Sequence, residues 1–374
     1  MKFTLSSTAL SSRLSALAKV INSKNSLAIL DCFLFQVKEG KLTITASDSE
    51  NVMKSTIDLN ESDSEGQFCV SNHTILDAVK ELSEQPLTFD IDVDSLNINI
   101  SYQNGHFNFI GQNADEYPTA QEVTDNSTVI SIGSDILSDN INRSLFATAQ
   151  DELRPVMNGV YFDISPEYLA IVATDGHKLV RNKDFSIKSE TPASFILPKK
   201  PANLLKNLLS RDSGDVEIKF NDRNAEIKFT DGLISCRLIE GRYPNYNSVI
   251  PQDNPNKLSI DRAALFSALK RVLVSASQSS SLIRFHIQSG LLTLKADDSD
   301  YGRSAEENIV CEYSGNGMDI GFKGTSMIEI LSNLTSQEVN IMLADPSRPG
   351  VIIPSEQPEN EDILMLIMPM LLND

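Results

Sequence analysis

Asp175 and His177 are the residues of this sequence whose types and spacing come nearest to catalytic chemistry. A carboxylate two residues from an imidazole can serve as an acid–base dyad or as part of a metal site. No nucleophile or third carboxylate lies nearby, so a hydrolase using this pair is an alternative hypothesis only. A strand end with a glycine-assisted turn at Gly176 is the plainer interpretation. A third is a binding surface, because His177 and Leu179 in a strand would point the same way.

Other catalytic and cofactor motifs are absent from the sequence. It contains no glycine-rich phosphate loop, no HExxH zinc motif and no EF-hand pattern. The four histidines and four cysteines are too widely spaced for a zinc or redox motif, which predicts no metal and no cofactor. The beginning, Met1-Lys2-Phe3-Thr4, lacks a signal-peptide core, and no apolar run reaches membrane-spanning length. A cytoplasmic protein with reduced thiols is therefore expected.

The charge is unevenly distributed along the chain. The net charge is −19, which argues against a uniformly basic nucleic-acid-binding surface. Three segments predicted to be helical, 9–21, 198–211 and 261–271, are nevertheless basic, and the second contains Lys199 and Lys200. These are either ordinary solvated helix faces or a surface for a polyanion, which needs only Lys and Arg near phosphates. With no Trp to stack on bases, duplex is favoured over single strands.

The chain repeats itself with a period of about 125 residues, too long for a solenoid unit. One set of landmarks is Ala46-Ser47-Asp48, Ala173-Thr174-Asp175 and Ala296-Asp297-Asp298. A second is Tyr117-Pro118, Tyr243-Pro244 and Met368-Pro369. This period predicts a triplicated domain, with boundaries at 1–124, 125–251 and 252–374.

Each repeat is predicted to consist of two half-units, each with one helix and roughly four strands. Helical spacing of apolar residues places the six helices near 9–21, 73–82, 135–147, 201–210, 261–274 and 325–334. Alternating apolar residues predict antiparallel strands between them. A half-apolar sheet requires a helix to cover it. The fold class expected is α+β, with two helices packed on two antiparallel sheets in each repeat.

The chain ends in an apolar run, 363–370, that contains Met368-Pro369-Met370. Alternate positions of this run fit a core strand of the third repeat. Methionine side chains are flexible and polarisable, so they also suit a surface that accepts varied apolar partners.

Several segments together resemble the bacterial DNA polymerase III beta subunit family, the replicative sliding clamps. They are Thr174-Asp175-Gly176-His177-Lys178-Leu179, Asp151 through Gly159, Gly241-Arg242-Tyr243-Pro244-Asn245-Tyr246 and the terminal Met368-Pro369-Met370. The resemblance covers the whole chain, including its length and threefold repeat.

This resemblance implies a non-catalytic scaffold rather than an enzyme. Family members are head-to-tail homodimers whose six domains form a ring, with helices lining a central hole. The ring encircles duplex DNA regardless of sequence and tethers the replicative polymerase for processive synthesis. A clamp loader opens the ring with ATP. The polymerase catalytic subunit, the loader, other polymerases and repair proteins share one cleft through short peptide motifs, and no membrane is involved. A structural repeat protein that binds peptides without DNA is the remaining alternative.

The resemblance also implies three sets of site residues. The peptide-binding cleft comprises Arg154, Met157, Thr174, Gly176, His177, Lys178, Leu179, Pro244, Val249, Ile367, Met368, Pro369 and Met370. Lys24 and Gln150, with Arg154 nearby, are expected to contact DNA, together with Lys199 and Lys200 of the basic segment. The dimer contact is expected to join Phe107 and Phe109 to the region of Val272 and Val274 in the partner.

Overall fold

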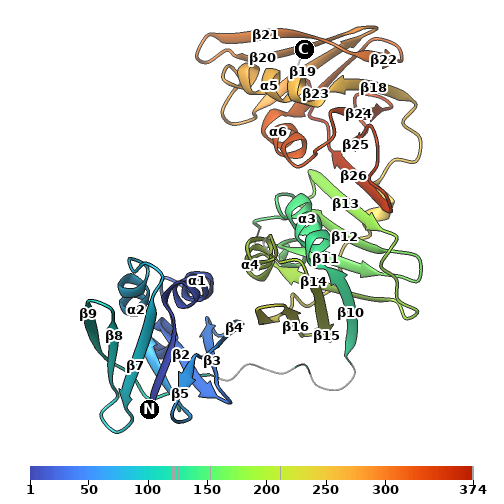
Figure 1. Ribbon diagram of the computed structural model, residues 1–374. Coiled ribbons are helices and arrows are strands. Elements are labelled where there is room, and N and C mark those ends of the chain that lie inside the picture. The colour runs from blue at the N-terminus through green and yellow to red at the C-terminus, as the bar shows by residue number, and fades with distance from the viewer. Residues whose placement is uncertain (119–122, 124–126, 152, 211, 373–374) are drawn as a thin grey trace. The chain divides into compact units, whose positions relative to one another are not determined.

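The structure is a computed structural model that describes residues 1–118, 123, 127–151, 153–210 and 212–372. The predicted boundary between residues 124 and 125 lies outside these residues, as does Arg211 of the basic segment. The described chain contains six α-helices, two in each predicted repeat (Figure 1). They are α1 (Ser7–Leu17), α2 (Asn72–Val79), α3 (Ser134–Leu145), α4 (Lys199–Leu209), α5 (Arg262–Leu273) and α6 (Gly324–Ser332).

The chain divides into two compact units, one formed by residues 1–138 and 200–238 and the other by 139–199 and 239–374. This division passes through the central repeat because its strands belong to two sheets, each shared with a neighbouring repeat. All described strand pairs are antiparallel, as the sequence predicts. The division into three domains at the predicted residues stays a prediction.

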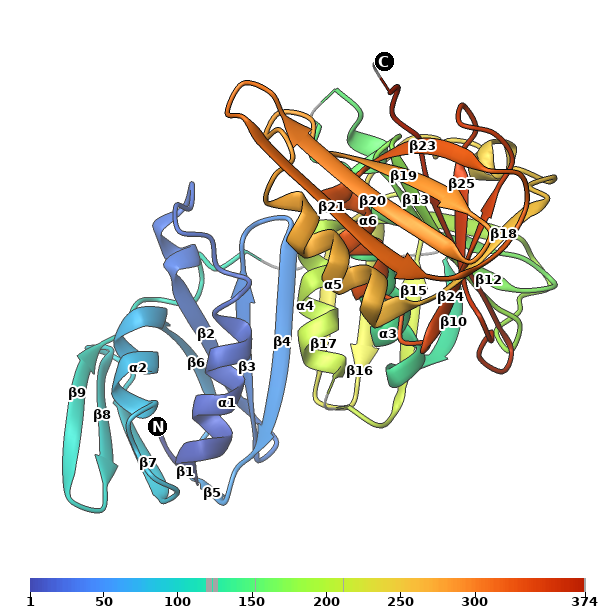
Figure 2. The same cartoon turned by 90° about the horizontal axis from the view of Figure 1, so that it is seen from above.

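The first unit holds two sheets. One has the strand order β5-β1-β7-β8-β9 and the other β10-β15-β16-β17-β4-β3-β2-β6. Helices α1 and α2 pack against each other, and α1 covers β3 and β4 (Figure 2). The strands are β1 (Lys2–Ser6), β2 (Cys32–Lys38), β3 (Lys41–Ser47), β4 (Asn51–Asp58), β5 (Glu61–Ser62), β6 (Gly66–Ser71), β7 (Pro86–Asp92), β8 (Asn97–Tyr102), β9 (Gly105–Ile110), β10 (Thr128–Gly133), β15 (Asp215–Phe220), β16 (Asn224–Phe229) and β17 (Gly232–Arg237).

The second unit also holds two sheets. Their strand orders are β14-β11-β12-β13-β26-β25-β24-β18-β22 and β21-β20-β19-β23, with α5 packed along β20 and β21 beside α6 (Figure 1). The strands are β11 (Gly159–Ile164), β12 (Leu169–Thr174), β13 (Lys178–Asp184), β14 (Ala193–Pro198), β18 (Asn256–Asp261), β19 (Leu282–Gln288), β20 (Leu291–Asp298), β21 (Arg303–Val310), β22 (Glu312–Ser314), β23 (Met318–Lys323), β24 (Glu338–Leu343), β25 (Gly350–Pro354) and β26 (Glu361–Ile367).

Local sequence explains where the helices begin. The Ser6 side chain accepts a hydrogen bond from the Ala9 amide at the start of α1. Asp261 caps α5 in the same way, accepting from the Ala264 amide at 2.7 Å. Serine and aspartate are favoured at this position because they satisfy amides that have no partner within the helix.

The first helix ends earlier than the apolar spacing over 9–21 predicts. It ends at Leu17, and Lys19 and Val20 then donate to carbonyls three residues back. This tightening of the last turn is common at helix ends, and the polar segment after Ile21 provides no further helical pattern. Lys19 therefore lies beyond the helix and not on its basic face.

The sheet of β11, β12 and β13 depends on aromatic packing at its centre. Phe162 on β11 is fully buried and stacks on Phe195 of β14, with ring centroids 4.5 Å apart. We expect Phe162→Ala to lower the unfolding free energy by about 3–5 kcal/mol, because it removes buried apolar surface and leaves a cavity. Urea unfolding monitored by circular dichroism measures the change. The exposed Val93→Ala should change the unfolding midpoint little, and equal midpoints for the two variants would contradict this role of Phe162.

Candidate functional site

The turn between β12 and β13 is organised by Asp175. Its carboxylate accepts hydrogen bonds from the backbone amides of His177 and Lys178, at 2.8 and 2.9 Å, and from the Lys178 ammonium at 2.8 Å. Burial alone would raise the pKa of Asp175, but these hydrogen bonds and the charge of Lys178 outweigh it and hold the pKa below its usual value. Gly176 adopts φ +89°, a conformation that favours glycine.

This geometry does not support the hydrolase hypothesis. The Asp175 carboxylate is bonded to the turn itself, and His177 is exposed to solvent. No group of three or more metal-ligating side chains occurs among the residues that the structure describes. The Asp175–His177 spacing is therefore that of a turn, in which the aspartate fixes the backbone.

A loop that follows α3 in the central repeat comes close to this turn. Arg154 pairs with Asp151 at 3.1 Å and is followed by a short 3₁₀ helix, Pro155–Met157. A β-carbon added at Gly176 would come within 2.9 Å of Arg154 Nη1 and 3.8 Å of Met157 Cε. The structure thus brings Arg154, Met157 and Gly176 together, as expected for one site.

The C-terminal segment reaches the same turn. After β26 ends at Ile367, the Met368 amide donates to the His177 carbonyl at 2.8 Å. The Met370 amide then donates to the Gly321 carbonyl on β23, also at 2.8 Å. Two segments that are nearly 200 residues apart in the sequence therefore meet through backbone hydrogen bonds.

Beneath these surface groups lies a hydrophobic cluster. It contains Leu179 and Tyr243, with Val156 packed against it, and Tyr243 stacks on Tyr161 with centroids 4.5 Å apart. Tyr246 donates to Asp163 at 2.7 Å. Leu179 is only 2% exposed and Ile367 is equally buried, so these two predicted cleft residues lie in the core and support the surface from below.

Several exposed apolar side chains belong to the predicted cleft residues or are next to them in the chain, and two of these are absent from the predicted set. Met368 and Val249, the last residue of the 3₁₀ helix Tyr246–Val249, are exposed, as is Pro244. Leu153 and Leu371, which neighbour predicted residues in the chain, are 89% and 90% exposed. Large exposed apolar residues are typical of binding surfaces, and the position of Leu153 and Leu371 next to Arg154 and Met370 in the chain was the available signal.

Two of the three lysines predicted to contact DNA, Lys199 and Lys200, are engaged within the protein. The Lys199 ammonium donates to the carbonyl of Ala149 at 2.8 Å, and burial lowers its pKa. The Lys200 ammonium, in the first unit, pairs with Asp48 and donates to the Asn22 side chain at 2.6 Å. Hydrogen bonds from Lys200 and Asn51 lower the pKa of Asp48 in spite of the burial that opposes them. Both lysines therefore hold loops in place rather than projecting as free cations.

The other predicted DNA contacts are at the surface. Lys24 and Gln150 are exposed, and Arg154 is about half exposed in its pair with Asp151. Lys200 holds the segment that leads to Lys24, and Lys199 holds the residue before Gln150. Charge along the sequence identifies these lysines, whereas the structure gives them a supporting position beside the exposed groups.

Of the residues predicted to join two chains, two lie on an edge strand and two at the end of α5. Phe107 and Phe109 are on β9, an edge strand, where their rings stack 6.0 Å apart. Val274 is exposed just after α5, whereas Val272 is 1% exposed and packs in the core of the third repeat. Val272 is therefore unavailable to a partner surface, because it continues the buried helical spacing of Leu265 and Leu269.

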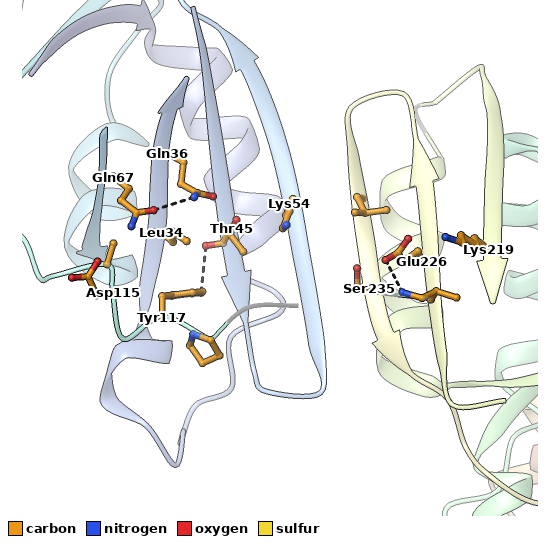
Figure 3. Close-up of a pocket in the computed structure, with 14 residues that line it drawn as sticks. Leu34, Gln36, Thr45, Lys54, Gln67, Asp115, Tyr117, Lys219, Glu226 and Ser235 are labelled. Carbon is orange, nitrogen blue, oxygen red and sulfur yellow. Dashed lines mark hydrogen bonds between the residues drawn. The ribbon is translucent and has the colours of Figure 1, made fainter. Parts of the chain in front are cut away.

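A separate pocket of about 630 Å³ in the first unit is lined by residues of β2–β4 and β15–β17, which belong to one sheet (Figure 3). Gln36 donates to Gln67 at 3.1 Å across its wall, and Tyr117 donates to the Thr45 carbonyl at 3.4 Å (Figure 3). Both positively and negatively charged side chains line the pocket. They include lysines and Glu226, which lie on strands of the same sheet. None of the predicted site residues lines it.

Family models of the DNA polymerase III beta subunit match nearly the whole chain. The N-terminal domain model matches residues 1–121, the central domain model 131–245 and the C-terminal domain model 247–371. The chain belongs to the DNA polymerase III beta subunit family. The predicted family and the predicted architecture of three tandem clamp domains are thereby confirmed, and the family is a processivity factor without catalytic activity.

Named relatives and solved structures agree with this assignment. The beta sliding clamp of Pseudomonas aeruginosa is 27% identical over 371 residues, covering 99% of this chain and 100% of that protein. A crystal structure of the Pseudomonas aeruginosa sliding clamp bound to griselimycin superposes with a TM-score of 0.94 at 25% identity, and each chain is fully covered. The Thermotoga maritima beta subunit gives a TM-score of 0.90 at 26% identity, again with full coverage. No helix in the described residues has the length and apolarity of a membrane span.

The depressed pKa of Asp175 predicts how the stability of the turn depends on pH. A folded-state pKa below the unfolded value of about 3.9 stabilises the fold above that pH, and the contribution disappears as pH falls through the folded pKa. We expect Asp175→Asn to lower the unfolding free energy by about 1–2 kcal/mol at pH 7, because the ion pair with Lys178 is lost. Urea unfolding at pH 7 and at about pH 3 should show the difference between variant and wild type shrinking in acid. A difference that is constant or larger in acid would contradict the assignment.

Proposed function

We propose that this protein is a DNA sliding clamp that encircles duplex DNA without sequence preference and tethers the replicative polymerase for processive synthesis. The observation that carries the proposal is the full-length match, in which all three repeats correspond in order to the domains of beta subunits. Cytoplasmic localisation follows from the role in replication. The catalytic step belongs to the polymerase and not to this chain.

A ring needs a second copy of the chain, and two sheet edges support a head-to-tail homodimer. β9 and β21 are both edge strands, and each ends in an apolar residue, Ile110 and Val310, that is 83% exposed. Free apolar edges invite pairing with another chain. Joining β9 of one chain to β21 of the next would cover Phe107, Phe109 and Val274, and head-to-tail contacts of this kind close into rings.

DNA contact is proposed for Lys24, Gln150 and Arg154, with Lys199 and Lys200 as internal supports. Contacts to phosphates need no base-reading residues and give binding that is independent of sequence. Few cations are needed if the ring is retained by topology, so a chain of net charge −19 can remain on DNA and still slide.

The turn Thr174–Lys178, the Arg154–Met157 loop and the C-terminal segment are proposed to form a peptide-binding site. Exposed Val249 and Met368 provide apolar contacts, and Arg154 and His177 provide polar ones. This composition suits short extended peptides with one or two apolar anchors. Proposed partners are the polymerase catalytic subunit, the clamp loader, other polymerases and repair proteins.

Retention on DNA of different topology tests the proposed function. Protein loaded by the ATP-driven loader onto a nicked circle should remain there at least about tenfold longer than on a linear duplex of the same length, because only free ends release a closed ring. Binding by phosphate contacts alone would depend on salt and not on ends. Lifetimes measured with labelled protein at high salt separate the two. Equal lifetimes on circle and linear DNA would rule out a sliding clamp.

Substitution at the exposed rim tests the peptide site. We expect His177→Ala and removal of residues 368–374 each to weaken binding of a peptide from the polymerase catalytic subunit by at least about tenfold, because interface anchors carry most of the binding energy. Fluorescence anisotropy gives the affinity, and the melting temperature checks the fold. His73→Ala, at an exposed histidine on α2, is the matched control. Unchanged peptide affinity in both site variants would refute the assignment.

A further inference from the structure

Lys178 is oriented into the protein, although its place in the turn suggests a peptide contact. Its side chain is 10% exposed, and its ammonium lies 2.8 Å from Asp175 Oδ2 and 3.2 Å from Glu329 Oε2. Burial would lower the pKa of Lys178, but the bonds and charges of Asp175 and then Glu329 raise it above its usual value. The ammonium can reach a bound peptide only by leaving both carboxylates.

Glu329 places one of these carboxylates on a rigid element of the third repeat. It belongs to α6, whose Met327, Ile330 and Leu331 are buried in the core of that repeat. The end of α6 is fixed in turn, because Arg262 donates to the Leu331 carbonyl at 3.1 Å. Glu329 thus presents a carboxylate from a fixed backbone to the turn in the central repeat.

A second lysine, Lys199, adds positive charge that acts on Lys178. The pKa of Lys199 is lowered first by its burial and then by the positive charge of Lys178. Asp175 and Glu329 supply the two negative charges. Without Glu329, the partly buried Lys178 would keep Asp175 as its one carboxylate partner among the ion pairs of the described residues, which favours displacement of Lys178 into solvent.

We propose that Lys178 and Glu329 form a positioning pair, which fixes the turn Thr174–Lys178 against α6 so that its rim is correctly placed beside the C-terminal segment. In this arrangement Lys178 acts through the turn and not by touching the peptide. The inference rests on the proposed peptide site, and Glu329 becomes a determinant of affinity without being part of the binding surface. The His177 carbonyl that holds Met368 is the backbone group whose position the pair controls.

Hydrogen exchange and peptide affinity together test the pair. The amides of His177 and Lys178 both donate to Asp175, so their exchange rates report the order of the turn without any ligand. We expect Glu329→Gln to raise both exchange rates about threefold or more. We also expect it to weaken binding of the polymerase-derived peptide about threefold to tenfold. Lys178→Met should do the same, and the double variant should be no weaker than Lys178→Met alone. Lys178→Arg, which keeps the charge and its reach, should restore affinity to within about twofold of wild type.

The control removes an exposed carboxylate of similar geometry. Asp77 pairs with Lys80 on α2 at 2.7 Å, and Asp77→Asn should leave both readouts at wild-type values. Unchanged amide exchange in Glu329→Gln would overturn the positioning pair, as would additive losses in the double variant. If His177→Ala weakens peptide binding while Glu329→Gln does not, the positioning role is wrong and the peptide site remains supported. If neither His177→Ala nor Glu329→Gln weakens peptide binding, although the amide exchange rates rise in Glu329→Gln, the proposed peptide site is wrong.

Discussion

The backbone pairing of β13 with β26 is the constraint on which the candidate site depends. The register places Lys178 opposite Ile367 and Asp184 opposite Glu361. The turn that precedes β13 must therefore lie beside the segment that follows β26, which is why His177 meets Met368. A slip of one residue would exchange the two faces of the strand. It would also separate Arg181 from Asp362, an ion pair that marks the same register.

The shared sheets also explain why the repeats do not behave as separate bodies. Each repeat contributes strands to a sheet completed by its neighbour, through β4 with β17 in the first unit and β13 with β26 in the second. The backbone groups of these strands are thus hydrogen-bonded within the chain and are not left unpaired at an edge. Among the sheets described, β9 and β21 remain as edges with exposed apolar ends, which are the positions where the proposed partner chain would continue the same pattern.

The sequence was informative where the signal is local or repeats along the chain. Helical spacing of apolar residues located all six described helices to within a few residues, and the threefold period indicated the architecture. The burial of Val272 was also accessible, since it follows Leu265 and Leu269 at helical spacing. The partners of Lys178 and Lys200 were not, because Glu329 and Asp48 are each about 150 residues away and only the folded sheets bring them near. Counting charges along the chain therefore identified cations but not which of them are free.

The proposed ring of two chains around DNA can be tested by closing it covalently. Cysteines introduced at Ile110 and Val310 would flank the proposed junction of β9 and β21, and all four native cysteines are buried. The protein is loaded onto a circular duplex, cross-linked with a bismaleimide and treated with detergent. If the ring is closed, the cross-linked protein should stay with the intact circle in detergent and be released when the circle is cut. Release from the intact circle as readily as from cut DNA, with both junctions cross-linked, would contradict it.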